Sequence, residues 1–81
     1  MRLTILSPNK KFFEGNVLTS KFPGDLGQFQ VLKNHSPLVS TLKSGFIVYK
    51  DFSNIDHKLS IKNGIVEVLN NSITVLVREN H

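Results

Sequence analysis

The sequence has no cysteine among its 81 residues, and this absence excludes disulfide bonds and thiolate metal sites. Small secreted domains usually carry disulfides, so we expect a reducing compartment. Long apolar runs are also missing, because none approaches the roughly 20 residues that span a bilayer. The apolar run at the N-terminus is too short for a secretory signal peptide. We therefore expect a soluble chain that reaches a membrane only through another protein.

Motifs of catalysis, phosphate binding and metal binding are absent as well. No serine stands in a G-x-S-x-G setting, and the Gly-Lys-Ser/Thr of a phosphate loop does not follow Gly24 and Gly27. His35, His57 and His81 lack the spacing to acidic residues that metal ligands show. The sequence predicts no catalytic residue, no cofactor and no metal, so a small hydrolase has no residues to support it.

The length restricts the chain to a single domain, residues 1–81, since two hydrophobic cores need a longer chain. Apolar residues make up 40% of the sequence, which suits a thin two-layer core and is too much for a disordered tail. We expect modest stability for the isolated chain, which a partner surface would increase.

The charge is mildly basic, with a formal net charge of +4 and only Lys10 and Lys11 adjacent to each other. A solvated basic surface is the simpler interpretation. The alternative is a small basic β-barrel that binds nucleic acid, with Tyr49 as the best single stacking residue. The remaining aromatic residues considered stand among apolar neighbours and are expected in the core. They are Phe12, Phe13, Phe22, Phe29 and Phe46.

An apolar period of 3.6 does not persist for three turns anywhere, whereas short runs of β-forming residues recur between turn residues. These runs are Arg2–Ser7, 16–22, 28–31, Leu38–Leu42, 46–50, 58–62, 65–69 and 73–77. Asn63-Gly64 indicates a turn or bulge because both residues tolerate positive φ, and 70–72 indicates a hairpin turn. The pattern predicts an all-β sandwich or small barrel of about eight to ten short strands.

Three segments carry a resemblance to a known family. Residues 5–8 and 12–17 read I-L-S-P and F-F-E-G-N-V, and residues 23–38 read P-G-D-L-G-Q-F-Q-V-L-K-N-H-S-P-L. Residues 42–47 read L-K-S-G-F-I, and residues 61–68 and 71–76 read I-K-N-G-I-V-E-V and N-S-I-T-V-L. In order and spacing they resemble the epsilon subunit of the rotary (F-type) ATP synthase. Its corresponding motifs are I-V-S-P, F-x-G-x-V, P-G-x-x-G-x-F/L-G-I/V-L-P-G/N-H-x-P-L, L-x-x-G-x-I, I-x-x-G-[GF]-x-E-V and N-x-V-T-[VI]-L.

The resemblance implies a flattened β-sandwich like the N-terminal domain of that subunit. It implies a non-catalytic rotor component of the central stalk that links the gamma subunit to the membrane c-ring. Such a component couples proton or sodium translocation to ATP synthesis. The implied place is the cytoplasmic face of the bacterial inner membrane, peripheral and within the complex, with no nucleic-acid partner.

The resemblance also implies contact residues. Gln28 matches a position that faces the c-ring loop, and the neighbouring turns should line the same end of the sandwich. The implied c-ring-facing residues are Asp25, Gln28, Lys33, Asn34 and His35. The implied gamma-facing residues are Ser40, Thr41 and Leu42. For His35, a turn residue that bonds the backbone is an equally good interpretation.

The sequence departs from the family pattern at three places, of which one is Asn63-Gly64, where the family often has two glycines. Lys33-Asn34 replaces the usual Pro-Gly or Pro-Asn before the histidine. The family normally continues into a C-terminal helical hairpin, whereas this sequence stops at His81. We expect a natural short form that lacks the hairpin, and therefore lacks the hairpin's block of hydrolysis and its ATP binding.

Overall fold

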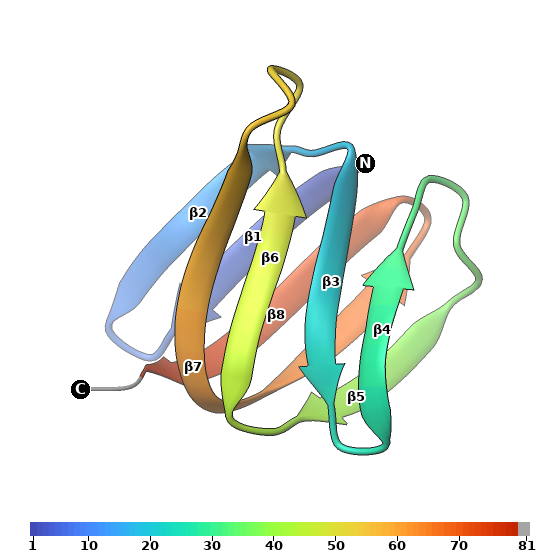
Figure 1. The fold of residues 1–81 in the computed structure, drawn as a ribbon. Helices are drawn as coiled ribbons and strands as arrows, with labels where there is room; N and C mark the ends of the chain where they lie inside the picture. The colour runs from blue at the N-terminus through green and yellow to red at the C-terminus, as the bar shows by residue number, and fades with distance from the viewer. Residues whose placement is uncertain (80–81) are drawn as a thin grey trace.

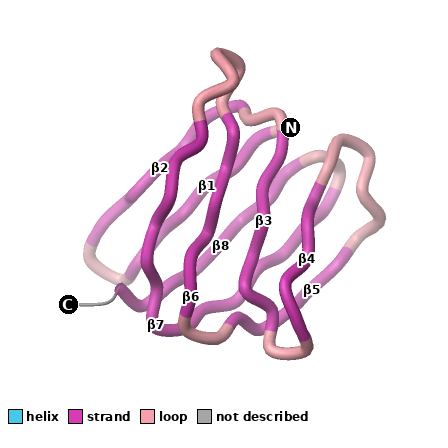
Figure 2. The backbone as a smooth tube through the Cα atoms, in the orientation of Figure 1, coloured by secondary structure: helices cyan, strands magenta, loops and turns pink. Residues whose placement is uncertain are grey.

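The computed structural model describes residues 1–79, which contain eight β-strands joined by loops and turns and no helix (Figures 1 and 2). The strands are β1 (Arg2–Ser7), β2 (Lys10–Asn16), β3 (Thr19–Gly24), β4 (Gly27–Val31), β5 (Leu38–Leu42), β6 (Gly45–Lys50), β7 (Asp56–Leu69) and β8 (Ser72–Glu79). The all-β prediction is confirmed.

The strands form two layers that share β7 (Figure 1). The front layer is β4-β3-β6 with the first half of β7, and the back layer is β2-β1-β8 with the second half of β7 and β5. On the opposite side, the single pair Gly24↔Leu42 joins β3 to β5. The sheet therefore wraps around one core as a flattened sandwich.

The bend of β7 falls where the sequence indicates a turn or bulge. The register of β7 against β8 shifts between Ile61 and Asn63, so the bulge is confirmed within one continuous strand. The reason for glycine differs from the expected one, since neither Asn63 nor Gly64 is among the positive-φ residues. A Cβ on Gly64 would lie 2.6 Å from the carbonyl oxygen of Leu76. Glycine is needed here because β8 passes so close.

The turn between β7 and β8 is confirmed at Asn70 and Asn71, which have φ values of 51° and 62°. Two consecutive left-handed residues match the right-handed twist of the flanking strands in a tight hairpin. Asparagine adopts this backbone more readily than most residues.

The predicted run over residues 16–22 is wrong as one strand. The structure ends β2 at Asn16 and begins β3 at Thr19. In between, the N–H of Val17 donates to the Met1 carbonyl at 2.9 Å, and the N–H of Leu18 donates to the Lys50 carbonyl at 2.8 Å. These bonds turn the chain from the back layer to the front layer. Strand β2, which the sequence did not predict, lies at the edge and pairs only with β1 among the described strands.

The core consists of the side chains that point inward from both layers at every second position. The buried apolar residues are Leu3, Ile5, Val17, Phe22, Val31, Leu42, Ile47, Ile61, Val66, Val68, Ile73, Val75 and Val77. Phe22 is the largest of these side chains, and Phe12, Phe13 and Phe29 pack against the cluster. The core assignment of Phe46 is wrong, because Ile47 points inward from β6 and its neighbour Phe46 is 53% exposed.

Candidate protein-interaction surfaces

One end of the sandwich is built around Asp25 in the turn between β3 and β4. The Asp25 N–H donates to the Thr41 carbonyl at 3.2 Å, and the Thr41 hydroxyl donates to the Asp25 carboxylate. Gly27, at φ 134°, completes the turn with a backbone that glycine adopts easily. Gln28 follows at the start of β4. We call this the Asp25 end.

The opposite end carries the loop that contains His35, between β4 and β5. The N–H of His35 donates to the Leu32 carbonyl at 3.1 Å, and His35 Nδ1 lies 2.7 Å from the Ser36 carbonyl oxygen. Asn34 bonds to Asn71, which places this loop beside the β7–β8 turn. The geometry agrees with the interpretation of His35 as a turn residue that bonds the backbone. We call this the His35 end.

The expectation that the five c-ring-facing candidates share one end is wrong. Asp25 and Gln28 lie at the Asp25 end, and Lys33, Asn34 and His35 lie at the His35 end (Figure 1). The physical reason is β4, whose five residues form an extended segment of about 17 Å. Adjacent turns in the sequence are therefore at opposite ends of the fold.

The three gamma-facing candidates also point in different directions. Thr41 is exposed and is bonded to Asp25. Leu42 is only 2% exposed and belongs to the core, so a partner surface does not reach it. Ser40 is half-buried, and its hydroxyl donates to the Thr41 carbonyl at 3.1 Å. Because successive side chains of a strand alternate between its faces, three consecutive residues cannot form one contact.

The outer face of the back layer carries a group of exposed apolar side chains that the sequence analysis did not identify. Val39, Ile65, Leu69 and Leu76 are 42–64% exposed. Ile65 and Leu76 are cross-strand partners, and Leu6 of β1 pairs with Leu76 on the other side. We call this the apolar back face.

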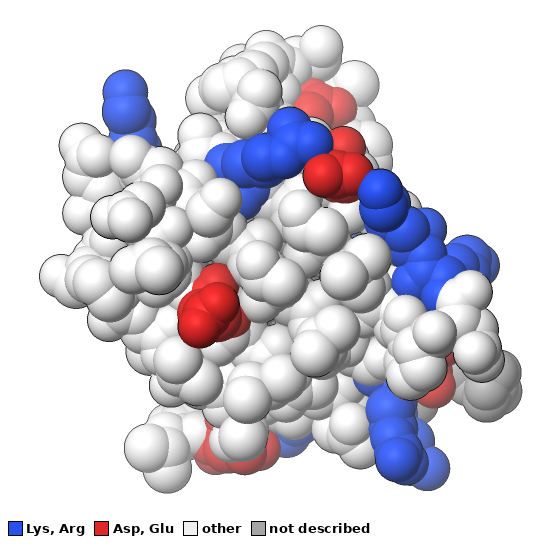
Figure 3. All heavy atoms as spheres, turned by 180° about the vertical axis from the view of Figure 1, so that it is seen from behind, with Lys and Arg blue, Asp and Glu red and all other residues white. Residues whose placement is uncertain are grey.

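The apolar back face is hollowed beside the bend of β7. The hollow has a volume of about 310 Å³ and is lined by Pro8, Asn63, Gly64, Ile65, Leu76, Val77 and Arg78. Figure 3 shows this side of the molecule, where an acidic group interrupts a largely uncharged area and basic side chains lie toward the borders. Exposed Glu67 belongs to this face, because it is the cross-strand partner of Val39 and Thr74. The sequence does contain a signal for this surface, the continuous apolar run Val75-Leu76-Val77. A strand with one exposed face normally alternates apolar and polar residues, so the middle residue of this run places an apolar side chain on the outer face.

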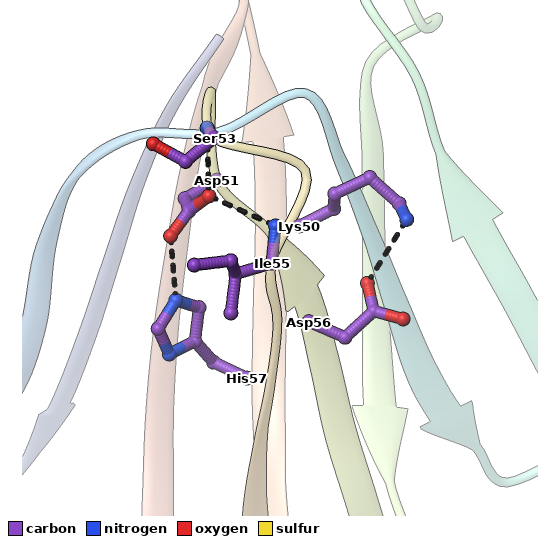
Figure 4. Close-up of polar contacts among 6 residues, drawn as sticks. All are labelled: Lys50, Asp51, Ser53, Ile55, Asp56 and His57. Atoms are coloured by element: carbon purple, nitrogen blue, oxygen red, sulfur yellow. Dashed lines mark hydrogen bonds and ion pairs between the residues drawn. The ribbon is translucent and has the colours of Figure 1, made fainter.

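The loop between β6 and β7 is organised by the carboxylate of Asp51 (Figure 4). Asp51 Oδ1 accepts the N–H groups of Ser53 at 2.8 Å and Ile55 at 3.1 Å. Its other oxygen, Oδ2, lies 2.8 Å from Nε2 of His57. The bond with His57, followed by the backbone bond from Ile55, lowers the pKa of Asp51 below its ordinary value of 3.8.

Tyr49 lies beside this loop with its ring in contact on both sides. The Tyr49 ring stacks on His57 at 5.1 Å between centroids and contacts Phe13 at 4.5 Å. Partial burial raises the pKa of its hydroxyl. A stacking residue for nucleic acid needs a free ring face, so this arrangement argues against the predicted role of Tyr49.

The described histidines are not placed for metal binding. His35 lies in the β4–β5 loop and His57 at the start of β7, and residues 1–79 contain no group of three or more His, Cys, Asp or Glu side chains that could hold a metal ion. His81 lies outside the described residues. The same residues include no helix long and apolar enough to cross a membrane.

Comparison with known proteins gives a consistent family. The family described as "ATP synthase, Delta/Epsilon chain, beta-sandwich domain" matches residues 1–80. The ATP synthase epsilon chain of Desulfosudis oleivorans is 39% identical over 95% of this chain and 58% of its own length. That of Chlorobium limicola is 35% identical over 96% of this chain and 89% of its own length. The chain thus spans less than two thirds of the Desulfosudis relative and most of the Chlorobium one.

Two solved structures share the fold at low sequence identity. A chain of the Euglena gracilis mitochondrial ATP synthase, solved with OSCP, F1 and c-ring, matches with a TM-score of 0.89 and 18% identity, over 95% of this chain and 49% of its own. A chain from the central stalk and c-ring of the Tetrahymena thermophila mitochondrial ATP synthase matches with a TM-score of 0.79 and 15% identity. The match covers 96% of this chain and 63% of the Tetrahymena chain. With the family match over residues 1–80, these findings establish that the chain belongs to the β-sandwich family of ATP synthase delta and epsilon chains.

Proposed function

We propose that the chain is a non-catalytic rotor subunit in the central stalk of an F-type ATP synthase. It links the gamma subunit to the c-ring and passes rotation driven by proton or sodium translocation to the sites of ATP synthesis. The observation that carries this proposal is the family match over residues 1–80. The structure adds support, because torque is transmitted well by a stiff block, and here cross-strand hydrogen bonds connect both layers through β7.

The c-ring contact in this proposal is the Asp25 end, through Asp25 and Gln28. A ring surface can meet only one end of the sandwich. We choose the end that holds Gln28, whose position resembles a c-ring-facing one in the family, so Lys33, Asn34 and His35 stand outside the proposed contact. The hydrogen bonds between Asp25 and Thr41 hold the β3–β4 turn against β5. A turn that is fixed in this way suits a contact that persists during rotation.

The gamma contact in this proposal is the apolar back face. Neighbouring exposed apolar side chains often mark protein interfaces, and Ile65 and Leu76 pair directly across β7 and β8. Glu67 is the acidic residue of this face and would meet a polar or basic group of gamma. Thr41 lies at the border of this face and connects it to the Asp25 end. The two proposed contacts are therefore adjacent, as they must be in a subunit that fastens one partner to the other.

The β-sandwich is the part of the family that this proposal concerns. The Chlorobium limicola epsilon chain is matched over 89% of its own length, so that relative consists mostly of this domain. The chain would sit at the cytoplasmic face of the bacterial inner membrane, peripherally, as part of the membrane-associated complex.

Binding to gamma is tested by mixing the purified chain with the gamma subunit at micromolar concentration and separating the mixture by size exclusion. We expect one complex, and we expect Ile65→Glu with Leu76→Glu to abolish it, because two charges would be buried unpaired. The matched control is Phe52→Glu with Ile55→Glu, which changes two apolar residues of similar exposure in the β6–β7 loop. Failure of the wild-type chain to bind gamma would refute the proposed function.

The choice of end is tested with the gamma complex and purified c-ring. Asp25→Lys with Gln28→Ala should weaken the attachment to the ring, whereas Lys33→Ala with His35→Ala should leave it unchanged. The opposite result would move the c-ring contact to the His35 end.

A further inference from the structure

The outer face of the front layer differs in charge from the apolar back face. Cross-strand pairing aligns Gln30, Lys21, Val48 and Lys58 in one row across β4, β3, β6 and β7. The adjacent row contains Gln28, Pro23, Phe46 and Ser60. We call the area defined by Lys21, Lys43, Phe46, Val48 and Lys58 the basic front face. It belongs to the four strands nearest the viewer in Figure 1.

The residues that the structure describes give the lysines of this face no acidic partner. Among residues 1–79, the ion pairs nearest to these rows join Lys50 to Asp56 at 3.4 Å and His57 to Asp51 at 2.8 Å. Lys21, Lys43 and Lys58 are exposed, and none of them takes part in an ion pair of the described residues. Three positive charges without a local counter-charge favour an anionic partner.

The same face has a hollow whose lining is part apolar and part polar and includes Lys43 and Lys58. It has a volume of about 400 Å³ and is lined by Pro23, Gln28, Lys43, Phe46, Val48 and Lys58. Phe46 is 53% exposed, and the ammonium group of Lys58 lies 5.4 Å from the centre of its ring. Lysine thus covers part of the aromatic ring and leaves the rest as a wall of the hollow.

These features distinguish between classes of anionic partner. A planar lipid surface would meet the lysines but could not fill a hollow between them. A nucleic acid would need a free aromatic face for stacking, and the face of Phe46 is shared with Lys58. A polypeptide satisfies both features, because an extended segment projects an apolar side chain between carboxylates on its neighbouring residues.

We propose that the basic front face binds an extended acidic segment of another protein. One apolar side chain of that segment occupies the hollow formed by Pro23, Phe46 and Val48, and flanking carboxylates pair with Lys21, Lys43 and Lys58. The amide side chains of Gln28 and Gln30 lie on the same rows and offer hydrogen bonds at the rim. This surface is separate from the apolar back face, so its test does not depend on the rotor assignment.

The probe is a fluorescently labelled synthetic peptide with glutamates on both sides of one central leucine. Its anisotropy is measured against the 81-residue chain at low salt, where surface charges are least screened. Lys21→Gln, Lys43→Gln and Lys58→Gln together should weaken binding about tenfold, as expected for the loss of three exposed ion pairs. Phe46→Ser should weaken binding of this peptide but not of a peptide with serine in place of the leucine.

The control variant removes the same charge away from the basic front face, through Lys10→Gln, Lys62→Gln and Arg78→Gln, none of which takes part in an ion pair of residues 1–79. It should change the affinity about twofold or less, and unchanged unfolding midpoints should show that both triple variants fold. Equal weakening by the two triple variants would overturn the proposal in favour of bulk charge. Tighter binding of phosphatidylserine vesicles or of single-stranded oligonucleotide through the same three lysines would overturn it in favour of those partners.

Discussion

Asn34 and Asn71, which are 37 residues apart, bind each other through two hydrogen bonds. The backbone N–H of Asn34 donates to Oδ1 of Asn71 at 2.6 Å, and Nδ2 of Asn71 donates to Oδ1 of Asn34 at 3.1 Å. Both residues have a left-handed backbone, with φ values of 66° and 62°. The pair therefore fixes the His35 loop to the β7–β8 turn and sets the shape of the whole His35 end.

This pairing predicts a coupled loss of stability. Asn71→Gly keeps the left-handed backbone and removes the hydrogen bonds, so it should lower the free energy of unfolding by about 1 kcal/mol. Asn71→Ala should lower it by about 2 kcal/mol, because alanine also strains the left-handed backbone. Urea unfolding measures both values. Asn70→Gly, at the neighbouring left-handed position, is the control and should cost less than Asn71→Gly.

A double-mutant cycle with Asn34→Gly and Asn71→Gly tests the contact itself. The coupling energy should be about 0.5–1.5 kcal/mol, the net contribution of a typical intramolecular hydrogen bond. Additive losses would show that the two turns are held together by other contacts.

The close approach of β8 to β7 predicts that Gly64→Ala is destabilising. The new Cβ would lie 2.6 Å from the Leu76 carbonyl oxygen, and relief requires the backbone to move. We expect a loss of about 1–3 kcal/mol, as in other overpacked sites. Gly15→Ala is the control, because there the nearest atom is Cζ of Phe13 at 3.1 Å, and a side chain at an edge strand can shift. If Gly64→Ala and Gly15→Ala lower the midpoint of thermal unfolding equally, the close approach of β8 is not the reason for glycine at position 64.

The bonds to Asp51 predict a specific dependence of stability on pH. Because the pKa of Asp51 is lower in the folded chain than its ordinary value of 3.8, its contribution is fully present above that value. The contribution is lost as the pH falls through the folded-state pKa. Asp51→Asn should therefore be less stable than the wild type at about pH 7, and the difference should shrink at about pH 3. Thermal unfolding at both pH values measures it.

The matched variant for this test is His57→Phe, which removes the hydrogen bond to Asp51 and keeps an aromatic ring against Tyr49. In that background the pH-dependent part of the Asp51→Asn effect should be smaller. Ion pairs with Lys11 and Arg2 lower the pKa of Glu14 from 4.5 to about 2. The wild type therefore also loses stability through Glu14 when the pH is lowered below 4.5. Comparing variants that all retain Glu14 cancels this contribution. A gap between Asp51→Asn and wild type that is the same at both pH values would disprove the role of Asp51.

The two phenylalanines of the front layer predict opposite results. Phe22 is fully buried, so Phe22→Ala should cost about 3–5 kcal/mol, enough to unfold a domain of this size. Phe46 is half exposed, and Phe46→Ala should cost less than about 1 kcal/mol. If the Phe22→Ala variant does not fold, Phe22→Leu leaves a smaller cavity and keeps the loss measurable by urea unfolding. Similar costs at both positions would mean that Phe46 is part of the core.

Much of the fold could be predicted because strand periodicity is a local property. Strict alternation over residues 28–31 and the β-forming run 38–42 correspond to β4 and β5. The position of β2 could not be read in this way, since its pattern at the sheet edge does not alternate between buried and exposed residues. The need for glycine at position 64 could not be predicted either, because it depends on the Leu76 carbonyl oxygen of the neighbouring strand.

The contact residues were less predictable than the strands for a geometric reason. Asp25 and His35 are ten positions apart in a motif that reads as one unit, but a strand lies between them and carries them to opposite ends. Asn34 and Asn71 show the reverse case, in which distant positions meet. No local pattern in the sequence indicates either relationship.

The sequence by itself determined the β-class of this protein, its turn at Asn70-Asn71, the burial of Phe22 and its family. These properties follow from side-chain alternation, from backbone preferences and from motif order, all of which are written along the chain. Only the tertiary structure decided which end holds Asp25, that Leu42 is buried and Phe46 exposed, and that one outer face is apolar while the other is basic. Those properties arise from the pairing of strands that are distant in the sequence, and pairing decides which side chains share a surface.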